Sequence, residues 1–355
     1  YEKLYETMIS NNLKDFDITD NSYIPHCKEI YNYIFKVIDY LIVENGGLEV
    51  SHYTGRETVE KLIFEKSRFR MCSMATANDT SEGRIIFELL GHPEWYNKLI
   101  GKNEHQCFFA SFTFDSNCLN HFRLYGKVNE KEATGVSMCF NSGSFDCSMS
   151  HQLDFITYKE FCEKYITLPL FRTLYVYPKD SYITSIGHVE YLELNEELNE
   201  EEKKERDDIM ECEKKIAKEI PEKIKSEIDK LKESINLFIN IDKDIKSVEK
   251  RIDIVSQILL NLSYIVKHAA FKEEQECRLF TIQKLRGTEH IHFCDKSRKM
   301  YVEYQLPVNE IKRITFAPKT SEYLLFKDRL EWKKEKLQKE NSTIMRCIQS
   351  KLPIA

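Results

Sequence analysis

Apolar side chains recur at every third or fourth position in several parts of this chain, which is the spacing of one face of an α-helix. The first such run lies within residues 1–47 and includes Ile30, Ile34 and Ile38, and a Gly-Gly pair ends it. Shorter runs predict further helices over residues 56–66, 85–90, 119–125 and 321–341. The sequence Gly-His-Pro at 91–93 is expected to end the second of these.

Other segments are rich in aromatic, β-branched and small residues, a composition typical of strands. They lie at residues 48–55, 67–76, 106–113, 134–141, 174–177, 188–192, 277–285, 300–306 and 311–318. We therefore expect an α+β fold with a mixed or antiparallel β core.

The composition shifts to heavily charged near Leu194 and stays so until about Arg251. Two stripes of apolar residues at helical spacing run through this region: Ile216, Ile220, Ile224, Ile228, Leu231, Ile235 and Phe238, and then Ile245, Val248, Ile252, Val255, Leu259 and Leu262. They predict an inserted helical hairpin over residues 196–261, in which Pro221 marks a helix start or a kink. The simplest interpretation is a solvated insertion, and the alternative is an arm that binds a protein partner or another copy of the chain.

These patterns divide the chain into four parts. They are an N-terminal helical segment (1–47), a discontinuous α+β core (48–195 and 262–320), the helical hairpin (196–261), and a C-terminal helix and tail (321–355).

Charged residues cluster in an unusual way between Phe271 and Phe280. If this segment is a strand, Glu274, Glu276 and Arg278 share one face, because side chains alternate between the two faces of a strand. Two carboxylates and a guanidinium are costly to bury without partners or a ligand. The row therefore indicates a functional site, or, in the plainer interpretation, an ion-paired face of a half-exposed strand.

Charge, cysteine content and the length of apolar runs indicate which classes of protein this chain could belong to. The 355 residues include 52 Lys plus Arg against 58 Asp plus Glu, so the net charge is -6 and gives no general indication of nucleic-acid binding. The 11 cysteines include no C-x-x-C pair and fit a reducing compartment. No apolar run is long enough to span a bilayer, and the first residues do not resemble a signal peptide. We expect a cytoplasmic protein without membrane contact.

Six short motifs occur in a fixed order along the chain. They are His52-Tyr53-Thr54; Asn78, Asp79 and Glu82; Ser111-Phe112-Thr113; Phe122-Arg123-Leu124-Tyr125-Gly126; Gly135-Val136 to Phe140; and Lys267, Phe271, Glu274, Glu276 and Arg278. Their order resembles a bacterial family catalogued as domain of unknown function 2971, over roughly residues 49–320 with the hairpin as an insertion. Phe122 and Phe271 stand where that family usually has Trp, and Thr113 replaces Ser.

The same order is similar to the H-Y-E arrangement of ADP-ribosyltransferases. This resemblance implies a β core like theirs and NAD as the substrate. It implies that Glu276 stabilises the oxocarbenium-like state formed when nicotinamide leaves the ribose, and that Glu274 positions the acceptor or assists as a base. His52 and Thr54, with Tyr53 between them, would bind the adenosine ribose and nicotinamide.

For two further roles, the resemblance offers two candidate residues each. Tyr125 or Phe122 would stack on nicotinamide, and Arg123 or Arg278 would neutralise the pyrophosphate. Plainer interpretations exist for several of these residues: His52 as a buried histidine bonded to backbone, and Phe122 with Tyr125 as core packing.

Two other clusters have plainer interpretations too. Asn78, Asp79 and Glu82 read as a turn with a helix cap. His290, His292 and Cys294 alternate on a short segment, but without a fourth ligand we expect no metal site there.

Three functions remain open. The first is an NAD-consuming ADP-ribosyltransferase or NAD glycohydrolase, acting on protein, nucleic acid or water as a bacterial defence or toxin effector. The second is a magnesium-dependent nuclease that uses Asp79, Glu82, Glu274 and Glu276. The third is a non-catalytic module that binds a partner through the hairpin. The first requires the segments around residues 52, 125 and 276 to line one cleft.

Overall fold

The structure, a computed structural model, describes residues 21–44, 47–74, 81–102, 105–125, 127, 131–145, 168–190, 199–241, 244–285, 290–295, 297–321, 323–337 and 346–353. Asn78 and Asp79 therefore lie outside the described residues.

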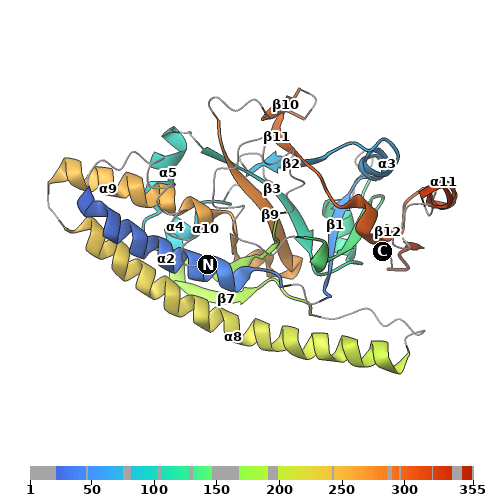
Figure 1. Ribbon diagram of the computed structural model, residues 1–355, viewed down its shortest axis with the longest axis horizontal. Coiled ribbons are helices and arrows are strands. Elements are labelled where there is room, and N and C mark those ends of the chain that lie inside the picture. The colour runs from blue at the N-terminus through green and yellow to red at the C-terminus, as the bar shows by residue number, and fades with distance from the viewer. Residues whose placement is uncertain are drawn as a thin grey trace.

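Most strands belong to one large sheet (Figure 1). Along it the order is β10-β11-β2-β3-β1-β4-β12-β13, and β9 pairs with both β3 and β5. The bounds are β1 Glu49–Thr54, β2 Phe69–Ser73, β3 His105–Thr113, β4 Val136–Asn141, β5 Phe171–Arg172, β9 Glu276–Lys284, β10 His292–Cys294, β11 Lys299–Tyr304, β12 Ile311–Phe316 and β13 Arg346–Gln349. All pairings are antiparallel except that of β12 with β13. The fold is therefore α+β with a mixed, mainly antiparallel sheet.

Strand β3 is the point where this sheet divides. One edge of β3 pairs with β9 along the whole strand, from His105 to Thr113. The other edge is shared, because β2 pairs with Phe108 and Phe109 whereas β1 pairs with Thr113. Two strands on one edge of a third leave the sheet open between them, and the cavity described below lies there.

A smaller sheet and a helical layer complete the fold. The smaller sheet has the order β7-β6-β8, with β6 Leu174–Tyr177, β7 Tyr182–Ile186 and β8 Val266–His268. The helices around it are α2 Ile24–Leu41, α4 Ile85–Leu89, α5 Pro93–Lys102, α8 Glu200–Ile239, α9 Ile245–Ile258 and α10 Leu260–Ser263. Three more helices, α3 Arg56–Phe64, α6 Leu119–Leu124 and α11 Tyr323–Leu337, accompany the large sheet.

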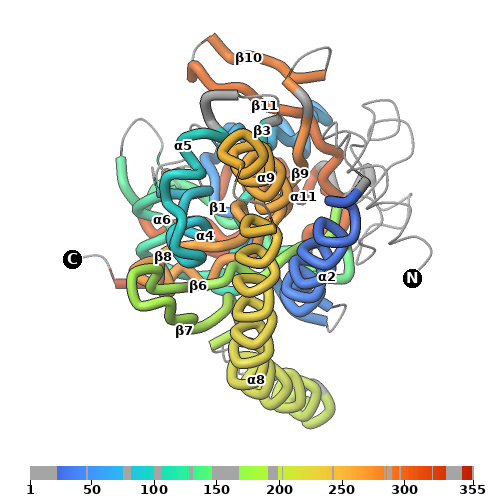
Figure 2. Tube along the Cα trace, turned by 90° about the vertical axis from the view of Figure 1, so that its left-hand side faces the viewer, coloured from blue at the N-terminus to red at the C-terminus, as the bar shows by residue number. Residues whose placement is uncertain are grey.

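The predicted helical hairpin exists as α8 and α9, and it is not a solvated arm. Most of its two apolar stripes is buried in one core with α2 and the smaller sheet, although Ile245 is 75% exposed; the buried members on α8 are Ile224, Ile228, Leu231, Ile235 and Phe238. Figure 2 shows α8 running along α2. Helix α8 continues through Pro221, which is buried. The expectation of a solvated insertion is wrong because α2 supplies the partner that this stripe needs.

Two buried arginines hold α8 in place. Arg251 donates from Nε and Nη2 to the Ile239 carbonyl, at 3.2 and 2.9 Å, and so places a cation at the negative C-terminal end of the helix. Arg172 on β5 forms a two-point ion pair with Glu213 on α8, at 2.9 and 2.7 Å. Both residues of this pair are only 2% exposed. The pair joins the helical layer to the large sheet.

Some predicted boundaries are wrong. The segment Gly-His-Pro at 91–93 does separate two helices as expected, since α4 ends at Leu89 and Gly91 has a φ of 87°, but Pro93 is already the first residue of α5. Proline suits this position, since the missing N–H has no partner in the first turn of a helix anyway. Of the strand expected at 188–192, residues 188–190 are not in a strand and residues 191–192 lie outside the described residues, whereas the strand Tyr182–Ile186 was not predicted. None of the helices that the structure describes combines the length and apolar content of a membrane-spanning helix.

Candidate functional site

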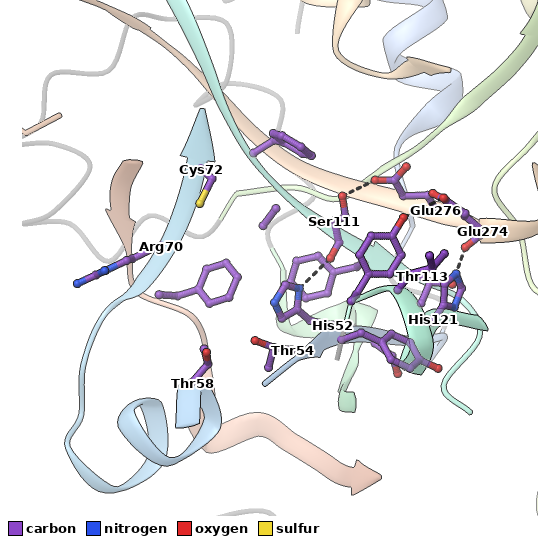
Figure 3. A pocket seen from close by; sticks show the side chains of 18 of the residues that line it. His52, Thr54, Thr58, Arg70, Cys72, Ser111, Thr113, His121, Glu274 and Glu276 are labelled. Atoms are coloured by element: carbon purple, nitrogen blue, oxygen red, sulfur yellow. Dashed lines mark hydrogen bonds between the residues drawn. The ribbon is translucent and has the colours of Figure 1, made fainter. Parts of the chain in front are cut away.

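A cavity of about 730 Å³ opens where β1 and β2 separate along β3 (Figure 3). Its walls come from β1, α3, β2, β3, α6 and the segment between β8 and β9. This volume is typical of pockets that bind small molecules and cofactors.

The cavity collects several of the residues singled out in the sequence. His52, Tyr53, Thr54, Tyr125, Glu274 and Glu276 all line it. The three segments around residues 52, 125 and 276 therefore meet, as the motif order predicted. Phe122, Arg123 and Arg278 are not among the residues that line this cavity.

Glu276 begins β9 at the floor of the cavity and is only 3% exposed. Arg278, two residues further on the same face, donates to both of its carboxylate oxygens, at 2.8 and 2.9 Å. The Ser111 hydroxyl donates to Oε1, and Lys267 Nζ lies 3.2 Å from Oε2. Both oxygens of Glu276 therefore have protein partners.

These charges set the protonation of the network. Burial by itself would raise the pKa of the Glu276 carboxyl, but Arg278 and Lys267 outweigh it and hold the pKa well below its usual range. Burial likewise disfavours the charged form of Lys267, but the carboxylates of Glu276, Glu274 and Glu82 together outweigh burial and raise the pKa of the ammonium. The carboxylate and the ammonium are both charged at neutral pH.

The Lys267 ammonium is the centre on which three carboxylates converge. Its Nζ atom lies 2.6 Å from Glu274, 3.2 Å from Glu276 and 3.4 Å from Glu82. A magnesium-dependent nuclease needs these carboxylates for its ion, whereas here a protein cation holds them. Asp79, the fourth ligand of that hypothesis, lies outside the described residues.

Glu82 is more than the helix cap that the sequence suggested. Its Oε1 accepts from Arg278 Nη2 at 2.7 Å, and the residue is only 7% exposed. Its Oε2 is buried without a hydrogen-bond partner among the described residues. Glu82 therefore belongs to the ion network on the cavity floor.

The row of charges is not a simple strand face. Residues Ala269–Glu274 form a 3-10 helix, and Gln275 has a left-handed backbone with φ of 42°. This single residue turns the chain before β9 begins, so Glu274 reaches Lys267 from the helix and Glu276 reaches it from the strand. The expected strand alternation is therefore wrong for Glu274. The expectation that the three charges share one side of the chain is right.

Close packing fixes the backbone of Glu276. Its carbonyl accepts from Thr173 N at 3.0 Å, and its N–H donates to the Tyr175 hydroxyl at 2.9 Å. A Cβ atom at Gly187 would lie 2.1 Å from the same carbonyl oxygen. Only glycine fits at 187, and the position of Glu276 is determined by its neighbours.

Tyr125 and Glu274 form the more open part of this site. Tyr125 follows α6, is 40% exposed, and donates from its hydroxyl to Glu274 Oε1 at 2.9 Å. Burial and then the charge of Glu274 raise the pKa of the phenol, so it stays a hydrogen-bond donor at neutral pH. The side chain of Glu274 is 17% exposed, against 4% for Glu276.

His52 lies on β1 with its ring against Phe69 and Phe112, at centroid distances of 5.0 and 5.4 Å. Its Nδ1 is 2.8 Å from the Ser111 carbonyl, which only accepts, so Nδ1 carries the proton and Nε2 is an acceptor in the neutral ring. Burial lowers the pKa of His52, and the Ser111 carbonyl opposes this only in part. Ser111 thus links His52 to Glu276 through its carbonyl and its hydroxyl.

Comparison with known proteins finds a family model that matches part of the chain. Residues 122–279 match the family model described as protein of unknown function (DUF2971). The match supports the resemblance to that family over this part of the chain, which carries Tyr125, Lys267, Glu274 and Glu276. His52, Glu82 and Ser111 lie before it. No curated protein and no solved structure matches the chain.

Two aromatic residues near the site have structural roles. The Tyr53 hydroxyl donates to the Asp115 carbonyl at 2.9 Å and accepts from Cys118 N at 2.8 Å. Phe122 is fully buried with its ring 4.9 Å from that of Tyr53. Phe122 is thus core packing, whereas Tyr125 lines the cavity.

The arginine expected to bind pyrophosphate is not found at its predicted positions. Arg278 is 1% exposed and bonded to Glu82, Glu276 and the Tyr264 carbonyl, so it does not reach a ligand. Four other basic residues line the cavity instead: Lys61, Arg68, Arg70 and Lys299. Figure 3 shows Arg70 on β2, on the far side of the cavity from Glu274 and Glu276, with its side chain directed away from them; its guanidinium lies 4.4 Å from the centre of the Tyr301 ring. Sequence reasoning missed this basic side because its residues come from separate segments without a shared motif.

Proposed function

We propose that the cavity binds NAD and that the protein breaks the bond between nicotinamide and ribose, transferring ADP-ribose to water or to an acceptor. The observation that carries this proposal is the meeting of His52, Tyr125, Glu274 and Glu276 in one cavity.

The distribution of charge supports a nucleotide ligand. Lys61, Arg70 and Lys299 supply the positive charge that a pyrophosphate needs. The exposed ring of Tyr125 is available to stack on nicotinamide, and His52 Nε2 is available to accept from a ribose hydroxyl. Thr54 adds a hydroxyl beside His52.

The chemistry requires stabilisation of a positive sugar carbon. The C1′–N bond breaks and its electron pair stays on the nicotinamide nitrogen, so nicotinamide leaves as a neutral molecule. C1′ then bonds to an oxygen of water or of the acceptor, and the proton of that oxygen passes to a carboxylate. The floor contains three carboxyl groups and two basic side chains, a balance that favours developing positive charge.

Because Glu274 and Glu276 differ in exposure, we assign them different roles. Glu274 has the more accessible carboxylate and is the acid that contacts the ribose in this proposal. Glu276, whose oxygens are held by Arg278, Ser111 and Lys267, positions Lys267 and the Ser111 hydroxyl. This reverses the emphasis that the motif resemblance placed on Glu276.

The test is release of nicotinamide from NAD by the purified chain. We expect Glu274→Gln to reduce turnover by about 100-fold or more, the usual effect of losing one charge-stabilising group. Glu303→Gln is the matched control, because Glu303 lines the same cavity but does not belong to the ion network described above; it should retain activity. Calorimetric titration of Glu274→Gln with NAD separates binding from turnover. The proposal fails if the wild-type chain neither binds nor cleaves NAD.

A defence or toxin effector is the setting that we propose for this activity. Expression in a bacterial host should deplete cellular NAD and stop growth. The Glu274→Gln variant, expressed to the same level, should do neither. Growth arrest by both proteins without loss of NAD would contradict this setting.

A further inference from the structure

A second polar cluster lies at the edge of the cavity, in the turn between β3 and α6. Donor atoms of Asp115, Cys118 and His121 all lie within 4.8 Å of one another. The three residues are spaced three apart in the sequence Asp-Ser-Asn-Cys-Leu-Asn-His. Neither the motif order nor the proposed reaction uses them as a group.

The backbone of this turn is held firmly. Tyr53 bonds both the Asp115 carbonyl and the Cys118 N–H, and Asn117 N donates to Asp115 Oδ1 at 3.1 Å. Cys118 is the residue before α6, but its side chain makes no capping hydrogen bond. A fixed backbone brings the thiol, the carboxylate and the imidazole together before any ligand arrives.

The buried side chain of His121 has an unsatisfied nitrogen, which indicates that a ligand could bind there. It is only 4% exposed, and its Nδ1 is buried with no hydrogen-bond partner among the residues that the structure describes. Leaving such a group unpaired costs about 1–3 kcal/mol. Its ring is kept in place by Tyr53, at a centroid distance of 5.0 Å. An ion bound to this nitrogen would remove the cost.

We propose that Asp115, Cys118 and His121 form a zinc-binding site. Thiolate, imidazole and carboxylate are the ligands that Zn²⁺ takes in proteins, whereas Mg²⁺ and Ca²⁺ avoid sulfur. On binding, Zn²⁺ replaces the thiol proton of Cys118, which passes to solvent. Three protein ligands leave a fourth position for water or a substrate atom. Because His121 also lines the cavity, the ion would lie at the cavity edge.

Cobalt reports directly on the thiolate. The full chain, treated with a chelator and then titrated with Co²⁺, should bind one equivalent and develop a thiolate-to-cobalt charge-transfer band that Zn²⁺ abolishes. Cys118→Ser should lose the band. Asp115→Asn and His121→Gln should weaken metal binding by more than the roughly 10- to 100-fold that loss of an outer partner costs.

Two other cysteines serve as matched controls. Cys212 is exposed on α8, and Cys72 lines another part of the cavity. Cys212→Ser and Cys72→Ser should both keep the band. The proposal is overturned if the wild-type chain shows no band, if Cys118→Ser keeps it, or if either control loses it.

A measurement on the wild-type chain avoids dependence on variants that fold poorly. Zn²⁺ should protect Cys118 from alkylation, measured by mass spectrometry of its peptide, while Cys212 is labelled equally with and without Zn²⁺. Equal labelling of Cys118 in both conditions would overturn the site. Neither experiment uses NAD, so its result is independent of the proposed reaction.

Discussion

Two polar clusters border the same cavity, and they differ in how well their atoms are satisfied. In the floor network of Glu82, Lys267, Glu274, Glu276 and Arg278, both oxygens of Glu274 and of Glu276 have partners, and Glu82 Oε2 is the one carboxylate oxygen of the network without a hydrogen-bond partner among the described residues. In the turn cluster of Asp115, Cys118 and His121, a buried imidazole nitrogen has none among the described residues. A network whose charges are paired with one another fixes the shape of the cavity floor, whereas a buried imidazole nitrogen without a partner has capacity for an added ligand.

Removing the buried arginine of the floor network should have the largest effect on stability. Arg278→Met leaves Glu276 and Glu82 buried without their strongest partner. Breaking a buried ion pair from one side costs about 3–5 kcal/mol. Urea denaturation of wild type and variant measures this loss in the free energy of unfolding.

Arg84→Met provides the control for that experiment. Arg84 forms a surface pair with Glu88, and its side chain is 47% exposed, so its removal should cost no more than about 0.5 kcal/mol. Similar losses in the two variants would mean that the floor network contributes little to stability.

Truncation of Phe122 tests the support beneath the turn cluster. Phe122→Ala should cost about 3–5 kcal/mol because the ring is fully buried against Tyr53. Leu124, on the same helix, is 57% exposed, and Leu124→Ala should change stability little. If Phe122→Ala left thermal stability unchanged and impaired only ligand binding, the ring would belong to the site and not to the core.

The smallest expected effect concerns pH and His52. Burial lowers its pKa in the folded state below the ordinary value of 6.5, so the unfolded chain binds protons more readily in this range. The contribution of His52 to stability is therefore lost as the pH falls below about 6.5. Denaturation at pH 7.5 and 5.5 should show a smaller difference for His52→Asn than for wild type. An unchanged difference would show that His52 titrates alike in both states.

The sequence predicted helices and strands well where the apolar residues followed a single regular spacing. The hairpin of α8 and α9 followed from its apolar stripes, and β3 and β9 from their composition. It did not predict that α2 covers the hairpin, because a stripe shows that a partner exists but not which one. It did not predict β13, which has only 4 residues and pairs in parallel with β12, the strand before α11.

The site was predicted in outline and not in detail. The order of the motifs predicted that His52, Tyr125 and Glu276 line one cavity. The turn at Gln275 was not predicted, because its positive φ occurs at a residue other than glycine or asparagine. Lys267 was part of a motif, yet only three dimensions show three carboxylates around it. Ser111 was likewise visible as a motif residue, without any sign that it links His52 to Glu276.

The buried pair of Arg172 and Glu213 has a mechanical consequence. Arg172 sits in β5, which pairs with β9 beside Glu276, and Glu213 also accepts from the Val189 N–H at 3.0 Å. The ion pair therefore connects α8 to β9, the strand that carries Glu276. A partner that binds α8 and shifts it would act on the cavity floor through this pair.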